Sequence, residues 1–115
     1  MSPKRKERVA PPAPPGGWSF RYQSQDAVEG WEDLCKQAPG PTYEAWRSIT
    51  TNPRTRSDRQ HQLRGELGWR EIDGVRMEQW QYEVTGAGRL WYAIDDARRT
   101  AWLTHACVGH PKKTE

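Results

Sequence analysis

Basic and imidazole side chains gather near the C-terminal end of this 115-residue sequence. Arg89 follows a Gly-Ala-Gly turn and begins an apolar run, and His110, Lys112 and Lys113 lie close to the chain end. A planar guanidinium can hold two phosphate oxygens at once. An imidazole can accept or release a proton near neutral pH. These residue types in this order favour chemistry on a phosphate backbone.

The same residues also have simpler interpretations. Arg89 could be a surface arginine at a strand end, and His110 with the two lysines could form a solvated tail. Trp80 and Tyr82 could stack on a nucleobase. Their placement two residues apart is more typical of one buried face of a strand.

A metal site is a weaker hypothesis. His105, Cys107 and His110 supply three ligands at most, and no Cys-x-x-Cys pair completes a structural zinc site. We therefore expect no metal and, without a Gly-rich phosphate loop or a dinucleotide fingerprint, no cofactor. Cys35 and Cys107 are expected to be free thiols of a cytoplasmic protein.

The elements that would position Arg89 are three predicted strands. Trp80, Tyr82 and Val84 alternate with polar residues, which indicates a half-buried strand. Residues 86–88 form a turn, residues 90–94 read as a fully buried strand, and residues 95–99 form the next turn. Residues 100–108 complete an antiparallel set. Before it, Asp73-Gly74 predicts a type I′ hairpin turn.

The N-terminal half predicts a strand and two helices. Residues 18–22 alternate as a half-buried strand. Ser24 or Asp26 is expected to cap a helix whose apolar stripe is Ala27, Trp31, Leu34 and Ala38. Residues 39–41 (PGP) are expected to end it, Thr42 to cap a second helix, and Asn52-Pro53 to stop that one. Residues 53–62 read as a polar, basic loop.

The expected fold class is α+β: an N-terminal strand, a helix hairpin, then a three- to four-stranded antiparallel sheet with both helices on one face. Residues 1–17 are expected to be a disordered, basic, Pro/Gly-rich tail, and residues 18–115 a single domain. Only 34% of the residues are hydrophobic and the mean hydropathy is −1.08, so the seven tryptophans must supply much of the core. No segment approaches the roughly 20 apolar residues of a membrane span, and no secretory leader is expected.

The net charge of +3 comes from the tail. Four basic residues and one acidic residue lie in residues 1–8, so the chain's 18 basic and 15 acidic residues leave 14 of each from Val9 onward. A neutral domain can still dock on phosphate if one face is basic. Residues 53–70 are basic, with five arginines against two acidic residues, and Arg64 lies within this stretch.

Four motifs resemble the RelE/ParE toxin superfamily, and within it the mRNA interferases of the RelE and YoeB type. Residues 63–65 (LRG) resemble the element that opens the sheet in RelE-like toxins. Residues 80–89 (WQYEVTGAGR) and 89–96 (RLWYAIDD) are similar to the strand, turn and strand around the family's arginine. Residues 106–110 (ACVGH) resemble the A-C-x-x-H end of YoeB. The likeness covers residues 63–110 and is only architectural over residues 18–52.

The resemblance implies the toxin of a type II toxin–antitoxin pair that cleaves mRNA on the ribosome without a metal. The RNA's own 2′-hydroxyl would be the nucleophile, so the site needs a base, cationic donors and an acid. Arg89 then binds the scissile phosphate, His110 is the general acid, and His61 stands near the position of the family's base. The residues expected to contact RNA are Arg64, Lys112, Lys113 and Tyr82. The expected partners are a cognate antitoxin and mRNA on the ribosome.

Three departures from the family pattern keep alternatives open. The strand leading to the turn shows Gln81, Tyr82 and Glu83 where relatives carry Lys or Arg, the segment 68–79 is longer, and the chain continues past His110. A ParE-like inhibitor of DNA gyrase shares the same scaffold. A non-catalytic RNA- or protein-binding module is the third hypothesis.

Overall fold

The computed structural model describes residues 5–7 and 14–109 and shows an α+β fold with two helices and a mixed sheet. The elements in chain order are β1 (Ser19–Tyr22), α1 (Gln25–Gln37), α2 (Pro39–Thr51), β2 (Gln60–Gln62), the 3-10 helix η1 (Gly65–Gly68), β3 (Trp69–Ile72), β4 (Val75–Glu83), β5 (Arg89–Asp95) and β6 (Thr100–Cys107). The α+β class predicted from the sequence is confirmed.

The first helix begins and packs as its sequence predicts. The backbone N–H of Ala27 donates to Ser24 Oγ, a 3.2 Å hydrogen bond that caps α1. The buried stripe includes Trp31 and Leu34. Gly30 lies where α1 crosses β6, and a Cβ atom there would collide with the carbonyl oxygen of Ala106. The helix backbone can therefore approach the sheet closely only because residue 30 has no side chain.

The second helix starts earlier than expected. The first helix ends at Gln37 with Ala38 as its C-cap, directly before residues 39–41, as expected, but the expectation that Thr42 caps the second helix is wrong. α2 begins at Pro39, because proline suits the first turn of a helix, where its missing N–H costs no hydrogen bond. Thr42 lies inside α2, is buried, and donates from Oγ1 to the carbonyl of Leu34 over 3.2 Å. Asn52 caps the C-terminal end, as expected.

The strands after the helices are antiparallel, as expected, but they number five (β2 to β6) rather than three or four. The predicted N-terminal strand, β1, joins the same sheet as a sixth strand and makes it mixed. The main order of the sheet is β1-β6-β5-β4-β2, with β3 also paired to β4. β1 runs parallel to β6, and the other pairs are antiparallel. The expected loop at residues 53–62 contains β2. The turn at Asp73 and Gly74 has positive φ at both residues (51° and 81°), as a type I′ turn requires.

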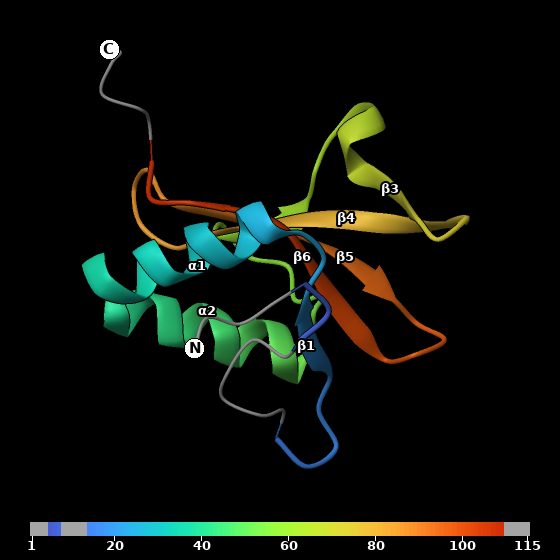
Figure 1. The fold of residues 1–115 in the computed structure, drawn as a ribbon, viewed down its shortest axis with the longest axis horizontal. Coiled ribbons are helices and arrows are strands. Elements are labelled where there is room, and N and C mark those ends of the chain that lie inside the picture. Colours follow the sequence, from blue (N-terminus) through green and yellow to red (C-terminus); the bar gives the residue numbers. More distant parts are fainter. Residues whose placement is uncertain (1–4, 8–13, 110–115) are drawn as a thin grey trace.

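One face of the sheet is covered by both helices (Figure 1). The core between them contains aromatic side chains from every layer; those from the sheet are Phe20, Tyr22, Trp80, Tyr82 and Tyr92. Phe20 meets Trp31 of α1 edge to face, with ring centroids 5.8 Å apart. Seven aromatic side chains thus share this core with seven Val, Leu and Ile side chains, and supply much of its buried area.

The opposite face is only partly covered. At one end a small cluster joins Ile72, Met77 and Ala93, with Trp102 packed against it. Arg70 of β3 reaches Gln23, with 3.3 Å between Nη2 and Oε1. The β3–β4 hairpin projects from the side of the sheet far from the helices (Figure 1). The rest of this surface, from β2 across to the end of β6, is called the open face below.

Part of the expected N-terminal tail contacts the domain. Lys6 N–H donates to the carbonyl of Tyr22 (2.7 Å), and Tyr22 N–H donates to the carbonyl of Glu7 (3.0 Å). The guanidinium of Arg99 reaches the carbonyl of Gly16 at 2.9 Å. Residues 1–4 and 8–13 lie outside the described part of the chain. Among the residues that the structure describes, no helix is long and apolar enough to cross a membrane.

Candidate active site on the open face

Strand pairing places two of the predicted site residues on the open face. His61 pairs with Gln81, and Arg89 pairs with Glu83 on one side and Cys107 on the other. Residues opposite each other, or two apart on one strand, point to the same side of a sheet. His61 of β2 and Arg89 of β5 therefore share a face with β4 between them. Their Cα atoms are two strand spacings apart across the sheet and two residues apart along it, a separation of about 12 Å.

The Arg89 side chain is half-buried and held by backbone carbonyls of the turn before it. Nη1 donates to the carbonyls of Thr85 and Gly88, both at 3.0 Å, and Nη2 donates to that of Gly86 at 3.2 Å. These partners are neutral, and among the described residues no carboxylate lies within ion-pair distance of Arg89. The guanidinium is thus fixed in place without an ion-pair partner among the described residues, so its charge can serve a bound phosphate.

The turn that holds Arg89 is itself braced. Thr85 Oγ1 accepts hydrogen bonds from the N–H groups of Ala87 (3.3 Å) and Gly88 (2.7 Å). Gly109 lies against this turn, since a Cβ at residue 109 would come within 2.7 Å of the Ala87 Cβ. The chain therefore leaves β6 beside the turn that positions Arg89. His110 follows directly in the sequence and, with Lys112 and Lys113, lies outside the described residues.

His61 is half-buried, and its Nδ1 lies 3.2 Å from the carbonyl oxygen of Gln62. A carbonyl oxygen can only accept, so this contact favours the tautomer with the proton on Nδ1. Nε2 then carries a lone pair, and the neutral imidazole has the form that a general base needs.

The open face carries a further pair that the sequence-based interpretation did not include in the site. Trp91 lies beside Gln81 and His105 in one cross-strand row, and its ring centroid is 5.2 Å from that of His105. The Trp91 indole N–H donates to Gln81 Oε1 at 2.8 Å. Residues 90–94 were expected to be fully buried, and Trp91 is the exception because it points to the open face. The bulge between Trp91 and Tyr92 also could not be foreseen from alternation.

Two of the residues expected to contact RNA lie elsewhere. Tyr82 is 9% exposed, packs in the core under the helices, and its pKa is raised by burial. It lies on the face opposite Arg89, so the two side chains cannot hold the same nucleotide. Arg64 is exposed and directly precedes η1, in the connection between β2 and β3. Two neighbouring hollows of about 360 and 330 Å³ share Glu44 and Tyr82 as lining residues, on the helix side.

Most arginines of the basic segment have partners within the fold. Arg59 donates to the carbonyls of Glu83 and Val84, and the guanidinium carbon of Arg56 lies 5.5 Å from the centroid of the Trp80 ring. Arg70 contacts Gln23, as described above. The positive charge that the sequence places in residues 53–70 is therefore used largely to join the loop to the sheet.

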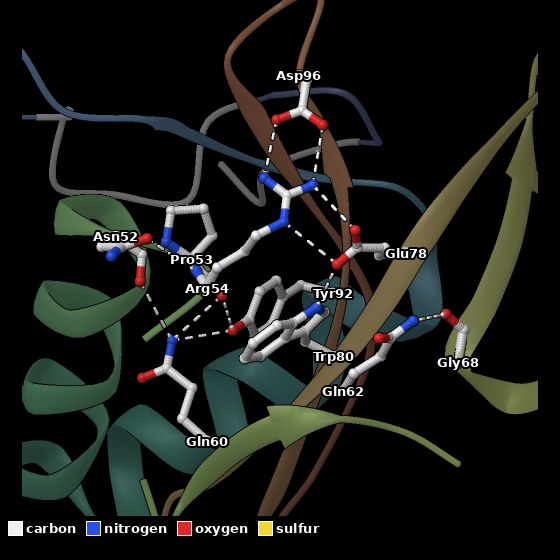
Figure 2. Close-up of polar contacts among 10 residues, drawn as sticks. All are labelled: Asn52, Pro53, Arg54, Gln60, Gln62, Gly68, Glu78, Trp80, Tyr92 and Asp96. Carbon is white, nitrogen blue, oxygen red and sulfur yellow. Dashed lines mark hydrogen bonds and ion pairs between the residues drawn. The ribbon is translucent and has the colours of Figure 1, made fainter. Parts of the chain in front are cut away.

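Arg54 makes the most extensive of these contacts (Figure 2). Its guanidinium lies between the carboxylates of Asp96, at 2.9 and 2.8 Å, and Glu78, at 3.2 and 3.3 Å. Burial favours the protonated form of Glu78, but hydrogen bonds from Trp80 and Arg54 outweigh it and lower the Glu78 pKa. The hydrogen bond from Arg54 likewise lowers the pKa of Asp96. Arg54 is neutralised by these acids and is not available to bind phosphate.

The described residues contain no group of three or more His, Cys, Asp or Glu side chains arranged to hold a metal ion. His105 and Cys107 lie on the same face of β6, as their spacing predicts, and Cys107 is a free thiol. His110, the third residue of the possible metal set, lies outside the described part.

Comparisons of the chain with protein-family models, with curated proteins and with solved structures found no match. The protein is an α+β domain. Its sheet has one face covered by helices and one open face that bears Arg89, His61 and His105.

Proposed function

We propose that this protein is a metal-independent endoribonuclease of the RelE/YoeB type, the toxin of a type II toxin–antitoxin pair that cleaves mRNA on the ribosome. The observation that carries the proposal is the state of Arg89. Its guanidinium is fixed by three neutral carbonyls on the open face, with no carboxylate partner among the described residues. An arginine held ready in this way suits a phosphate that gains negative charge during the reaction.

The arrangement of elements supports the same proposal. A strand, two adjacent helices and a run of antiparallel strands follow one another in the chain. The RelE/ParE superfamily shares this order of elements. The arginine motif falls at the start of β5, directly after the turn at residues 86–88. Two features go beyond the expected pattern: β1 pairs parallel to β6, and β2 occupies an edge of the sheet.

The proposed reaction is an in-line transesterification. His61 Nε2 takes the proton of the ribose 2′-hydroxyl, and the 2′-oxygen forms a bond to phosphorus. Arg89 stabilises the negative charge on the non-bridging oxygens, worth roughly 10²- to 10³-fold in rate for one such donor. The bond from phosphorus to the 5′-oxygen breaks, and His110 gives that oxygen a proton. The products are a 2′,3′-cyclic phosphate and a 5′-hydroxyl end.

Induced expression in a bacterial host tests the proposal, with growth and mRNA 5′ ends followed together. The wild-type protein should stop growth and create new mRNA ends in the codon register. Arg89→Ala should abolish both effects at equal protein level. Arg47→Ala is the matched control, because Arg47 lies on α2 in an exposed ion pair with Glu44, far from the open face.

The other outcomes separate the alternatives. Growth arrest with intact mRNA would favour a gyrase inhibitor on the same scaffold. Normal growth with soluble wild-type protein would contradict the toxin proposal in that host and favour a binding module. Arrest by the Arg89→Ala variant as strong as by the wild type would show that Arg89 is not the phosphate-binding residue.

A further inference from the structure

Trp91 differs from the other tryptophans and tyrosines in the middle of the sheet. Trp80 and Tyr92 are 2% and 0% exposed beneath the helices, whereas Trp91 is half-buried on the open face. Its neighbours in the cross-strand row are Gln81, also half-buried, and His105, which is exposed. A half-exposed indole on a sheet surface offers a flat apolar face that a ligand can reach.

The orientation of the Trp91 ring is fixed before any ligand arrives. The indole N–H donates to Gln81 Oε1 at 2.8 Å, and the His105 ring lies against the indole with an interplanar angle of 57°. A ring held on both sides loses little conformational entropy when a ligand stacks on it. Aromatic side chains on the exposed face of a β-sheet are a common way of binding single-stranded RNA, since every base offers a flat surface.

The place of Trp91 relative to Arg89 sets what would bind. The two residues are two positions apart on β5 and point to the same side, about 6.7 Å apart along the strand. Glu83 faces Arg89 from β4, so a phosphate is repelled from that side and is favoured on the β6 side, where His105 lies. A phosphate at Arg89 then brings the base of an adjoining nucleotide over the Trp91 ring, beside His105.

We propose that Trp91, with the His105 ring packed against it, forms a stacking platform for one nucleobase of single-stranded RNA, next to the phosphate that Arg89 holds. The inference rests on the proposed ribonuclease function and adds a binding subsite to it. The platform tolerates any base, because stacking reads the flat face rather than the hydrogen-bonding edge. Gln81 keeps the indole in position, and its amide N–H groups lie beside the platform.

The test is RNA binding by the full chain, measured apart from cleavage. The probe is a fluorescent single-stranded RNA decamer with 2′-O-methyl groups throughout, which cannot supply the 2′-hydroxyl nucleophile. Trp91→Ala should weaken binding by about 5- to 150-fold, the range seen when one stacked aromatic is removed. Trp91→Phe should retain most of the affinity. Trp69→Ala is the matched control, because Trp69 is 42% exposed on β3 and away from the platform.

A second set of probes carries a single abasic position moved along the decamer. At one position, removing the base should weaken binding to the wild-type protein. The same removal should not change binding to the Trp91→Ala variant, because that variant has already lost the stacking contact. His105→Ala changes an exposed residue, so it keeps the fold, and it should give a smaller loss of affinity at the same position.

Equal binding by the wild type, Trp91→Ala and His105→Ala would overturn the platform. Failure of the wild type to bind the decamer, with mRNA cleavage intact in cells, would also overturn it while the proposed activity stands. If neither binding nor cleavage is found, the proposed function fails and the platform with it.

Discussion

The hydroxyl of Tyr92, in the middle of β5, donates a 2.6 Å hydrogen bond to the carbonyl of Pro53, just after α2. Gln60 Nε2 donates to the same hydroxyl at 3.0 Å; Figure 2 shows Tyr92, Gln60 and Pro53. Ser48 Oγ in turn donates to Gln60 Oε1 at 2.5 Å. This buried chain ties the end of α2 and the edge strand β2 to the strand that begins with Arg89. Burial raises the pKa of Tyr92, so the phenol stays protonated and can donate.

Tyr92→Phe should therefore lower stability by about 1 to 2 kcal/mol, because it removes one buried hydrogen bond and leaves part of the Gln60 and Pro53 pairing unmade. Urea unfolding of the variant and the wild type measures this. Tyr43→Phe is the control, since Tyr43 is 50% exposed and should lose nothing measurable. Equal stability of both variants would show that the hydrogen bonds of the Tyr92 hydroxyl to Pro53 and Gln60 do not stabilise the fold.

The contacts of Arg54 predict an acid-sensitive fold. The pKa values of Glu78 and Asp96 are lowered in the folded protein, so the unfolded chain binds more protons as the pH falls. The stabilisation is present above the unfolded values, near 4, and is lost as the pH drops below them. The free energy of unfolding, measured between pH 7 and pH 3, should fall over the lower part of this range.

Arg54→Gln should remove most of that pH dependence. At pH 7 it should cost about 1 to 2 kcal/mol, less than breaking a fully buried ion pair, because 35% of the Arg54 side chain and 66% of the Asp96 side chain are exposed. Denaturant unfolding of the variant over the same pH series is the measurement. An unchanged slope would mean that other carboxylates govern the acid transition.

Gly30 should tolerate no side chain. Gly30→Ala puts a Cβ into the carbonyl of Ala106 and must push α1 away from β6, at a cost of roughly 1 to 3 kcal/mol. Gly40→Ala is the helical control, because nothing lies within 4 Å of a Cβ there and alanine is the better helix former. In thermal unfolding, the melting temperature of Gly30→Ala should fall, and that of Gly40→Ala should rise or stay unchanged. A stable Gly30→Ala variant would contradict the close approach of α1 to β6.

His61 provides a separate test of the proposed chemistry. Loss of a general base slows a reaction by about 10²- to 10⁴-fold, so His61→Ala should lower the cleavage rate on ribosome-bound mRNA by such a factor. Its KM should change little, because His61 is proposed to move a proton rather than to hold the substrate. His61→Gln keeps a polar side chain on β2 and should be equally slow. Full activity of both variants would assign the base to another residue.

Much of the fold could be predicted from local signals. The Ser24 cap, the Asn52 end of α2, the Asp73-Gly74 turn and the Gly86–Gly88 turn each depend on backbone preferences of a few adjacent residues. The turn at Gly86–Gly88 also located Arg89 at the start of a strand, so the residue on which the proposed site depends was found from the sequence.

The features that were missed depend on distant partners. β2 reads Gln-His-Gln, has no apolar alternation, and is a strand only because β4 pairs with it. The partners of Arg54 lie 24 and 42 residues away in the chain, so its role in the fold was hidden within a basic stretch. Trp91 sat within an apolar run, and only the pairing of β5 with β4 and β6 placed it on the open face beside His105.

The most direct test of the central claim is the single-turnover cleavage rate of ribosome-bound mRNA by purified wild-type, Arg89→Ala and Arg47→Ala proteins, with the chemistry of the new ends identified. We expect 2′,3′-cyclic phosphate and 5′-hydroxyl ends for the wild type. The rate should be lower by about 10²- to 10³-fold for Arg89→Ala and unchanged for Arg47→Ala. Cleavage by a folded Arg89→Ala variant at the wild-type rate, or no cleavage by the wild type, would contradict the proposal.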